Sequence, residues 1–244
     1  MTQPTTIATV SIRPDVGVLS VLRHLNYKPW YALAEFVDNS LESFLRHRAS
    51  IEAIEGKGAR LQVELTIDPS GGGTITVRDN AAGIHESEYQ RAFRPADPPP
   101  DINGLSEFGM GMKSAACWFG MKFAVRSAAL GEGVERTVGF DVEEIVKTKS
   151  DTLPVSVARV PTNQHYTEVV VSRLHSPPQG RTIGKIKEHL ASIYRVFIAE
   201  GTLQLRFRSP GVDEVLGYEE PKILTAPPAE SLVRKYKLTT EPRL

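Results

Sequence analysis

The stretch ALAEFVDNSLESF, residues 32–44, decides how the rest of the chain is interpreted. On a helix, at about 100° per residue, its apolar side chains fall on one side and its acid and amide side chains on the other. The polar side consists of Glu35, Asp38, Asn39 and Glu42, without a Lys or Arg. A helix face exposed to water usually mixes both signs of charge at positions four apart. We therefore interpret this face as oxygen ligands for a hard cation and a water molecule, with an ordinary surface helix as the alternative.

The composition limits the kinds of protein that the chain can be. Its 244 residues suffice for one large domain or two small ones, and 29 Lys and Arg residues balance 29 Asp and Glu residues. Such a balance gives no overall field to attract nucleic acid or a membrane surface. The single cysteine, Cys117, excludes an intrachain disulfide and a cysteine-rich zinc site. No apolar run approaches the roughly 18 residues of a membrane span, so we expect a soluble, cytoplasmic protein with no membrane partner.

Hydrophobic periodicity predicts a few helices among many strands. The expected helices cover residues 16–25, 30–54, 85–93, 115–119 and 182–199. The expected strands cover residues 61–67, 75–77, 121–129, 134–142, 155–160, 167–172, 203–207 and 214–218, the first two as a hairpin. This mixture predicts an α+β fold, a two-layer α/β sandwich, rather than a doubly wound sheet.

Two segments are expected to lie outside this regular structure. Residues 94–106 hold four prolines without periodicity and are expected to form a long, functional loop. Residues 221–228 are rich in proline and mark a domain boundary. We therefore expect one domain in residues 1–221, followed by a linker or the start of another domain in residues 222–244.

Asp79 closes a predicted strand, and Gly83 follows four residues later. A carboxylate at a strand end can accept a hydrogen bond from an exocyclic amine, and a nearby glycine lets a flat ligand approach the backbone. The alternative is an ordinary turn aspartate that caps its own loop.

A glycine-rich segment with Gly104, Gly109 and Gly111 precedes a predicted helix. Free backbone N–H groups and the helix dipole favour an anion at such a place, and Lys113 adds a positive charge. The segment is not a Walker loop, because Met112 stands where glycine is required. The alternative is a helix entry that packs tightly on the sheet.

The fixed order of these three segments is stronger evidence than any one of them. At this point the chain resembles the GHKL ATPase superfamily, which includes gyrase-type topoisomerases, the ninety-kilodalton heat-shock chaperone, sensor histidine kinases and MutL. AEFVDNSLES is similar to its first motif, VRDNAAGI to the second, GLSEFGMGMKSA to the third and YTEVVV to the fourth. Among the branches, GLSEFGMGMKSAACWFG is most similar to the microrchidia (MORC) group. Two positions depart from the pattern, since Ala81 and Tyr166 stand where the family has glycine.

The resemblance implies the Bergerat ATP-binding fold, with a mixed, mostly antiparallel sheet and helices on one face. It implies that Glu35 polarises the attacking water and that Asn39 binds Mg²⁺. Asp79 would accept from the adenine amine, and residues 94–106 would form a lid. The remaining contacts to the nucleotide would come from Gly83, Gly104, Phe108, Gly109, Met110, Gly111, Met112, Lys113 and Thr167.

The function that the resemblance implies is ATP binding and slow, Mg²⁺-dependent hydrolysis, which drive lid closure and ATP-dependent homodimerisation of a larger protein. A nucleotide-sensing clamp without hydrolysis is the alternative, because catalysis in such modules often needs a lysine from a following domain. Glu35 disfavours a histidine kinase, since sensor kinases commonly carry asparagine there. DNA is a candidate partner through the full-length protein, although solvated faces explain the short basic runs more simply.

Overall fold

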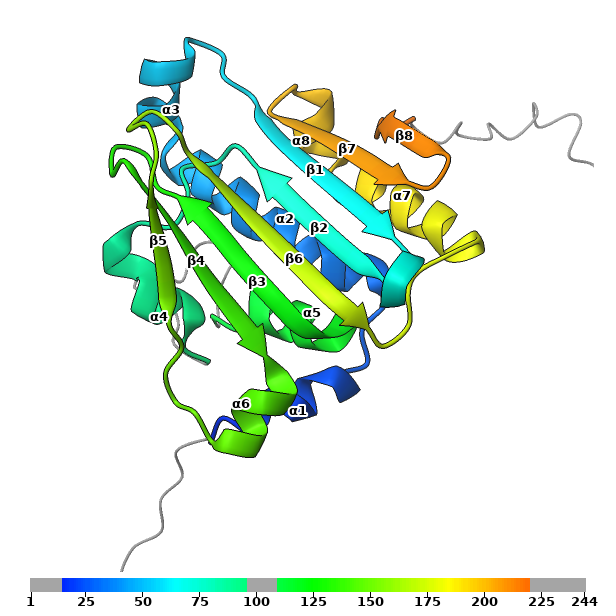
Figure 1. The fold of residues 1–244 in the computed structure, drawn as a ribbon. Helices are drawn as coiled ribbons and strands as arrows, with labels where there is room; N and C mark the ends of the chain where they lie inside the picture. The colour runs from blue at the N-terminus through cyan, green and yellow to red at the C-terminus, as the bar shows by residue number, and fades with distance from the viewer. Residues whose placement is uncertain (1–14, 96–108, 220–244) are drawn as a thin grey trace, which may run out of the picture.

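A computed structural model describes residues 15–95 and 109–219 of the chain. Within these ranges eight strands form one sheet, in the order β5-β4-β3-β6-β2-β1-β7-β8 (Figure 1). The strands are β1 (Leu61–Asp68), β2 (Thr74–Asp79), β3 (Gly120–Ala128), β4 (Val134–Asp141), β5 (Val155–Arg159), β6 (Tyr166–Leu174), β7 (Leu203–Ser209) and β8 (Val212–Val215). The helices are α1 (Val18–Val21), α2 (Pro29–Arg46), α3 (Arg48–Glu55), α4 (Tyr89–Phe93), α5 (Gly111–Phe119), α6 (Val142–Thr148), α7 (Arg181–Ile193) and α8 (Arg195–Ala199), with 3₁₀ turns at Leu22–His24, Ser70–Gly72 and Glu86–Glu88.

The sheet is mixed and mostly antiparallel. β1 pairs with β2 as an antiparallel hairpin, as predicted, and with β7 in parallel. β6 lies between β2 and β3 and runs antiparallel to both. In this register Arg78 pairs with Glu168, which brings the end of β2 beside the start of β6. Residues that are far apart in the sequence therefore meet at one place on the sheet.

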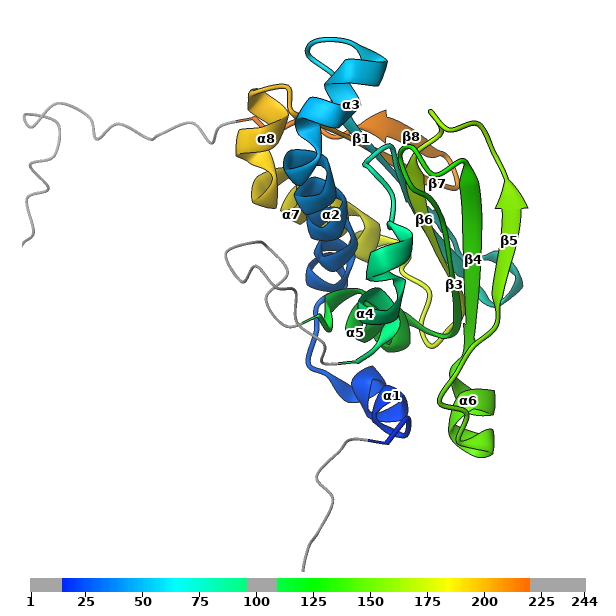
Figure 2. The same ribbon diagram turned by 90° about the vertical axis from the view of Figure 1, so that its left-hand side faces the viewer.

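Helices cover one face of this sheet. Figure 2 shows the sheet edge-on, with α2, α5, α7 and α8 together on one side. Side chains at alternate strand positions, such as Leu65, Ile75 and Phe207, are fully buried, and the burial of each contributes about 1.5–3 kcal/mol. The predicted two-layer α+β sandwich is confirmed.

Helix α2 places its apolar side against the sheet and its polar side toward the other helices. Proline at its first position is pre-organised for a helix, because its φ is fixed and its missing N–H needs no partner there. Leu33, Val37 and Leu41 are fully buried. The four polar side chains of this helix are half-buried and not fully exposed to solvent. The structure therefore does not support the alternative interpretation of α2 as an ordinary surface helix.

Several predicted bounds were wrong. The helix expected over residues 30–54 is two helices, because His47 leaves the helical conformation (φ −107°, ψ 15°), and residues 182–199 are likewise divided at Tyr194. The third-motif helix begins at Gly111 rather than at residue 115, so its glycine lies in the first turn. Helix α6 was not predicted, β8 ends three residues earlier than expected, and residues 16–25 form only a short helix and a 3₁₀ turn.

Some sequence predictions concern residues outside the two described ranges. Residues 96–106 of the expected lid, together with Gly104 and Phe108, lie outside the described residues, as does the predicted boundary with residues 222–244. In the described ranges, no helix combines the length and apolarity needed to cross a membrane.

Candidate functional site

A cleft of about 160 Å³ opens between α2, the end of β2, the segment 83–92, the start of α5, and β6. One water molecule needs only about 10–15 Å³ by this measure, so the cleft has room for a ligand many times larger. The predicted site residues on its lining are Asn39, Asp79, Gly83, Gly109, Gly111, Met112, Lys113 and Thr167. All three sequence motifs therefore meet at one cavity.

Asp79 lines the cleft, and three hydrogen bonds hold its carboxylate in place. Its Oδ1 accepts from the backbone N–H groups of Ala81 and Thr167, each at 2.9 Å, and its Oδ2 accepts from the Ser40 hydroxyl at 2.6 Å. Burial raises the pKa of the Asp79 carboxyl, although these bonds and the Arg78 charge oppose that rise. The bonds leave a lone pair on Oδ2, so a ligand can still donate to this carboxylate.

Ser40 is a site residue that the sequence analysis missed. It lies on the buried side of α2 and is only 4% exposed, where a helical serine usually bonds its own backbone four residues back. Ser40 does lie 3.1 Å from the Phe36 carbonyl, but its shorter contact is to Asp79. Nothing in the local pattern reveals a partner that stands 39 residues away.

Gly83 is needed for a second reason besides the approach of a flat ligand. It has φ +75°, a conformation that favours glycine, and a Cβ there would overlap the Ala128 carbonyl group, lying 2.7 Å from its carbon. The close approach is thus to the end of β3 as well as to any ligand in the cleft.

Asn39 presents an oxygen to the cleft. Its Nδ2 donates to the Glu35 carbonyl oxygen one turn back, at 2.7 Å. This bond fixes the orientation of the amide and engages one of its two protons, so Oδ1 is the atom that can bind a cation. Among the described residues no group of three His, Cys, Asp or Glu side chains could hold a metal ion. A hard cation here fits only with Asn39 Oδ1 plus oxygens from a ligand and water, a donor set typical of Mg²⁺.

Glu35 lies next to the cleft, against the start of α5. The Tyr27 hydroxyl donates to its Oε1 at 3.2 Å, and a Cβ on Gly111 would overlap its Oε2. Burial raises the pKa of the Glu35 carboxyl, the Tyr27 hydrogen bond opposes that rise, and the charge on Asp38 adds to it. A raised carboxyl pKa brings the group nearer to the range where it can exchange a proton near neutral pH.

The start of α5 lines the cleft and brings the backbone N–H groups of its first turn to it. Gly109 has φ +59°, and Gly111 is the first helical residue, so the first-turn amides have no partner inside the helix. Lys113 is 2% exposed and its Nζ donates to the Ala92 carbonyl oxygen at 2.7 Å, so part of its charge is already engaged. Met110 packs against the core instead of lining the cleft.

The lining of the cleft also includes charged residues that the sequence analysis did not assign. Arg46 on α2 pairs with Glu42 at 2.5 Å and approaches Glu88 at 3.9 Å. Arg91 pairs with the same Glu88 at 3.0 Å. Because Arg46 lies two turns after Asn39, helical periodicity could have placed it on this wall.

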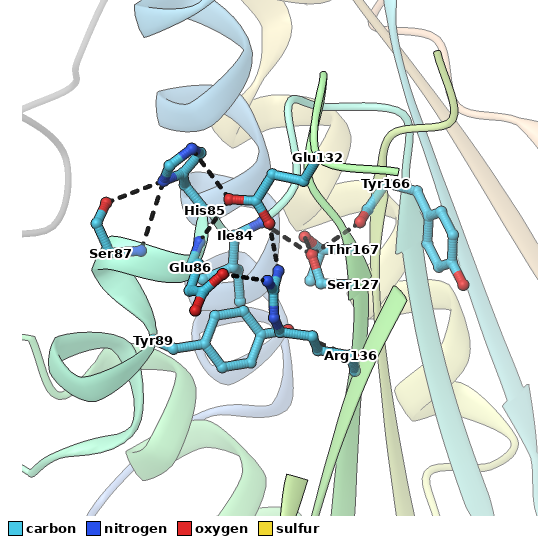
Figure 3. Close-up of polar contacts among 10 residues, drawn as sticks. All are labelled: Ile84, His85, Glu86, Ser87, Tyr89, Ser127, Glu132, Arg136, Tyr166 and Thr167. Atoms are coloured by element: carbon cyan, nitrogen blue, oxygen red, sulfur yellow. Dashed lines mark hydrogen bonds and ion pairs between the residues drawn. The ribbon is translucent and has the colours of Figure 1, made fainter. Parts of the chain in front are cut away.

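The wall formed by residues 84–89 is tied to the β3–β4 hairpin (Figure 3). Glu132 accepts from the Glu86 N–H at 2.8 Å and pairs with His85 at 3.0 Å and with Arg136. Arg136 also pairs with Glu86 at 2.6 Å. Burial opposes ionisation of Glu132, but these donors hold its pKa below the ordinary value.

Tyr166, where the resemblance led us to expect glycine, points to the open face of the sheet. The Arg78 guanidinium lies 3.8 Å from the centre of its ring, and the Arg126 guanidinium lies 5.8 Å away. The Tyr166 hydroxyl donates to Glu135. The Tyr166 side chain therefore does not line the cleft, whose lining on β6 is Thr167 and Val169.

Comparison with known proteins agrees with this geometry. Residues 27–169 match the family described as histidine kinase-, DNA gyrase B-, and HSP90-like ATPase. The chain belongs to this family. The match covers the first three motifs and the start of the fourth, and membership in this ATPase family supports ATP binding. A search of curated proteins found no match, so the closer MORC resemblance stays a prediction.

Proposed function

We propose that the chain binds Mg²⁺-ATP in the cleft and hydrolyses it slowly, and that hydrolysis is coupled to closure of the segment 94–106 and to dimerisation of a larger, MORC-like protein. Family membership supports the nucleotide. The observation that carries the proposal is the set of polar groups that line one cleft: the Asp79 carboxylate as an acceptor for an amine, the Asn39 amide oxygen as a ligand for a cation, and the first turn of α5.

In this proposal each residue has one task. Asp79 accepts from the base, the first-turn amides of α5 bind phosphate oxygens, and Asn39 Oδ1 holds the cation. Bound Mg²⁺ neutralises charge on the phosphates. Glu35 orients a water molecule near the start of α5 and receives its proton. Catalysis then depends on positioning and charge stabilisation, as in other phosphoryl transfers.

A clamp that binds ATP without hydrolysing it is the second candidate. Two observations favour it: Lys113 already donates to the Ala92 carbonyl, and Glu35 lies beside the cleft lining. Nucleotide binding alone would then stabilise the closed, dimeric state.

The substitution Glu35→Gln separates the two candidates. We expect it to leave ATP affinity within about threefold of wild type and to lower single-turnover phosphate release by about 100-fold or more. Glu52→Gln is the control and should release phosphate at the wild-type rate, because Glu52 is partly exposed on α3, pairs with Arg48 and does not line the cleft. Equal release by wild type and Glu35→Gln would exclude Glu35 as the base, and binding without release in either would favour the clamp.

A further inference from the structure

Ser127 lies on β3 directly behind the cleft and is 1% exposed. Three polar groups converge on its hydroxyl oxygen (Figure 3). The Ile84 N–H lies at 2.8 Å, the Tyr166 carbonyl oxygen at 2.9 Å and Thr167 Oγ1 at 3.2 Å. Ile84 follows the glycine of the second motif, and Thr167 belongs to the fourth, so one buried side chain links both walls of the cleft.

The direction of each hydrogen bond follows from counting protons. A serine hydroxyl has one proton and two lone pairs. The Tyr166 carbonyl has no proton to give, so at 2.9 Å the serine proton must lie between the two oxygens. The Ile84 N–H can only donate, and it takes one serine lone pair. The second lone pair is left for Thr167, whose hydroxyl must therefore be the donor in their contact.

This assignment fixes what Thr167 offers to a ligand. Thr167 lines the cleft, its N–H is given to Asp79, and its hydroxyl proton is given to Ser127. Only lone pairs of Oγ1 remain on the cleft side. The neighbouring Asp79 Oδ2 also offers a lone pair, so this end of the cleft accepts hydrogen bonds and donates none from these two side chains.

We propose that Ser127 is a specificity-determining residue of the nucleotide site: by taking the Thr167 proton, it makes Thr167 an acceptor that selects a base with an exocyclic amino group over one with a carbonyl in the same place. The inference rests on the proposed nucleotide function and adds a positioning residue that none of the sequence motifs contains. Ser127 does not touch the ligand and acts through Thr167.

The test compares ATP with inosine triphosphate, which has a carbonyl at C6 and a proton at N1 in place of the amino group and bare N1. Calorimetry with Mg²⁺ gives the ratio of the two Kd values for each protein. Wild type should prefer ATP. In Ser127→Ala the Thr167 proton is released and can be donated to the C6 carbonyl, so the preference should fall by about three- to tenfold. Ser127→Thr keeps a hydroxyl and should retain the wild-type ratio.

Two further variants show whether Ser127 acts through Thr167. Thr167→Val removes the hydroxyl and should lower the preference by itself, and Ser127→Ala should then cause no further change in a double-mutant cycle. Ser172→Ala, on the opposite face of β6, is the control and should keep the wild-type ratio. If Ser127→Ala does not fold, Thr167→Val alone decides, because an unchanged ratio there overturns the inference.

The outcomes separate this inference from the proposed function. A purely structural role of Ser127 would weaken both nucleotides equally, and an unchanged ratio in Ser127→Ala with ATP still bound would overturn the inference alone. If wild type binds neither nucleotide, the proposed function fails, and the inference fails with it.

Discussion

Replacing Asp79 with asparagine should stabilise the fold while it weakens nucleotide binding. An asparagine can keep every contact of Asp79: its Oδ1 can accept from Ala81 and Thr167, and its Nδ2 can donate to Ser40. Ser40 can then give its own proton to the Phe36 carbonyl, 3.1 Å away. The second Nδ2 proton takes the place of the Oδ2 lone pair that is open to the cleft, and every other buried polar group keeps a partner, so the hydrogen-bonding cost of the substitution is small.

The effect on stability depends on pH, and its sign follows from the raised pKa of Asp79. Burial makes the folded state hold the proton more tightly than the unfolded chain, whose pKa is about 3.9. The free energy of unfolding of the wild type therefore falls as pH rises from about 4 to the folded pKa, by about 1.4 kcal/mol for every pH unit between the two values. Asparagine does not titrate, so the free energy of unfolding of the variant does not fall in this way. The stability of the variant relative to wild type therefore increases across that pH interval.

The effect on binding has the opposite sign. The Nδ2 group replaces the acceptor that an exocyclic amine would use, so one hydrogen bond to a charged group is lost. Such bonds contribute about 1.5–3 kcal/mol, which corresponds to an affinity for ATP lower by about 10- to 100-fold. Stability and affinity should thus separate in a single variant.

Urea unfolding of wild type and Asp79→Asn from pH 4 to pH 8, with ATP titrations at pH 7.5, measures both effects. Asp68→Asn is the matched control, because Asp68 is exposed and its bonds to Ser70 lower its pKa, so no gain with rising pH is expected. A stability difference that is constant over the pH range would show that Asp79 has no raised pKa, and an unchanged ATP affinity would remove Asp79 from the site.

Two further predictions concern packing around the cleft. Gly83→Ala should lower the free energy of unfolding by about 3 kcal/mol or more, because it combines a positive φ with overlap of the Ala128 carbonyl; a thermal unfolding midpoint equal to wild type would contradict this. Tyr194→Phe removes a buried hydroxyl that donates 2.7 Å to Asp38 and lies 3.0 Å from the Ala34 carbonyl. It should cost about 1–3 kcal/mol in urea unfolding, and a cost below about 0.5 kcal/mol would mean that water replaces the hydroxyl.

The sequence predicted the layers of the fold because periodicity reports burial directly. The alternation Leu61, Val63, Leu65 marked β1 correctly, and the hairpin with β2 followed from the short turn. The interruption at His47 was not predictable, because the apolar spacing continues into α3, where Ile51 is fully buried. Helix α6 did carry a signal that was overlooked: Asp141 caps it by accepting from the Glu144 N–H, and two acidic residues occupy its first turn.

The candidate site was predictable where residues reveal their chemistry in sequence order, as Asn39 and Asp79 do. It was not predictable where a residue acts through a distant partner. Ser40 and Ser127 look like ordinary small residues in a helix and a strand. The packing of α2 against the end of β2 shows what Ser40 binds, and the pairing of β3 with β6 shows what Ser127 binds.

The contacts of the Tyr166 ring connect the uncovered face of the sheet to the strand that holds Asp79. Guanidinium groups from β2 and β3 lie close to the ring on that side, while the N–H of the next residue along β6 donates to Asp79. An adjoining domain, an antibody or an engineered charge that pulled those cations away would loosen the strand from behind. If the cleft binds a nucleotide as proposed, its affinity could then be changed from the face of the sheet opposite the helices.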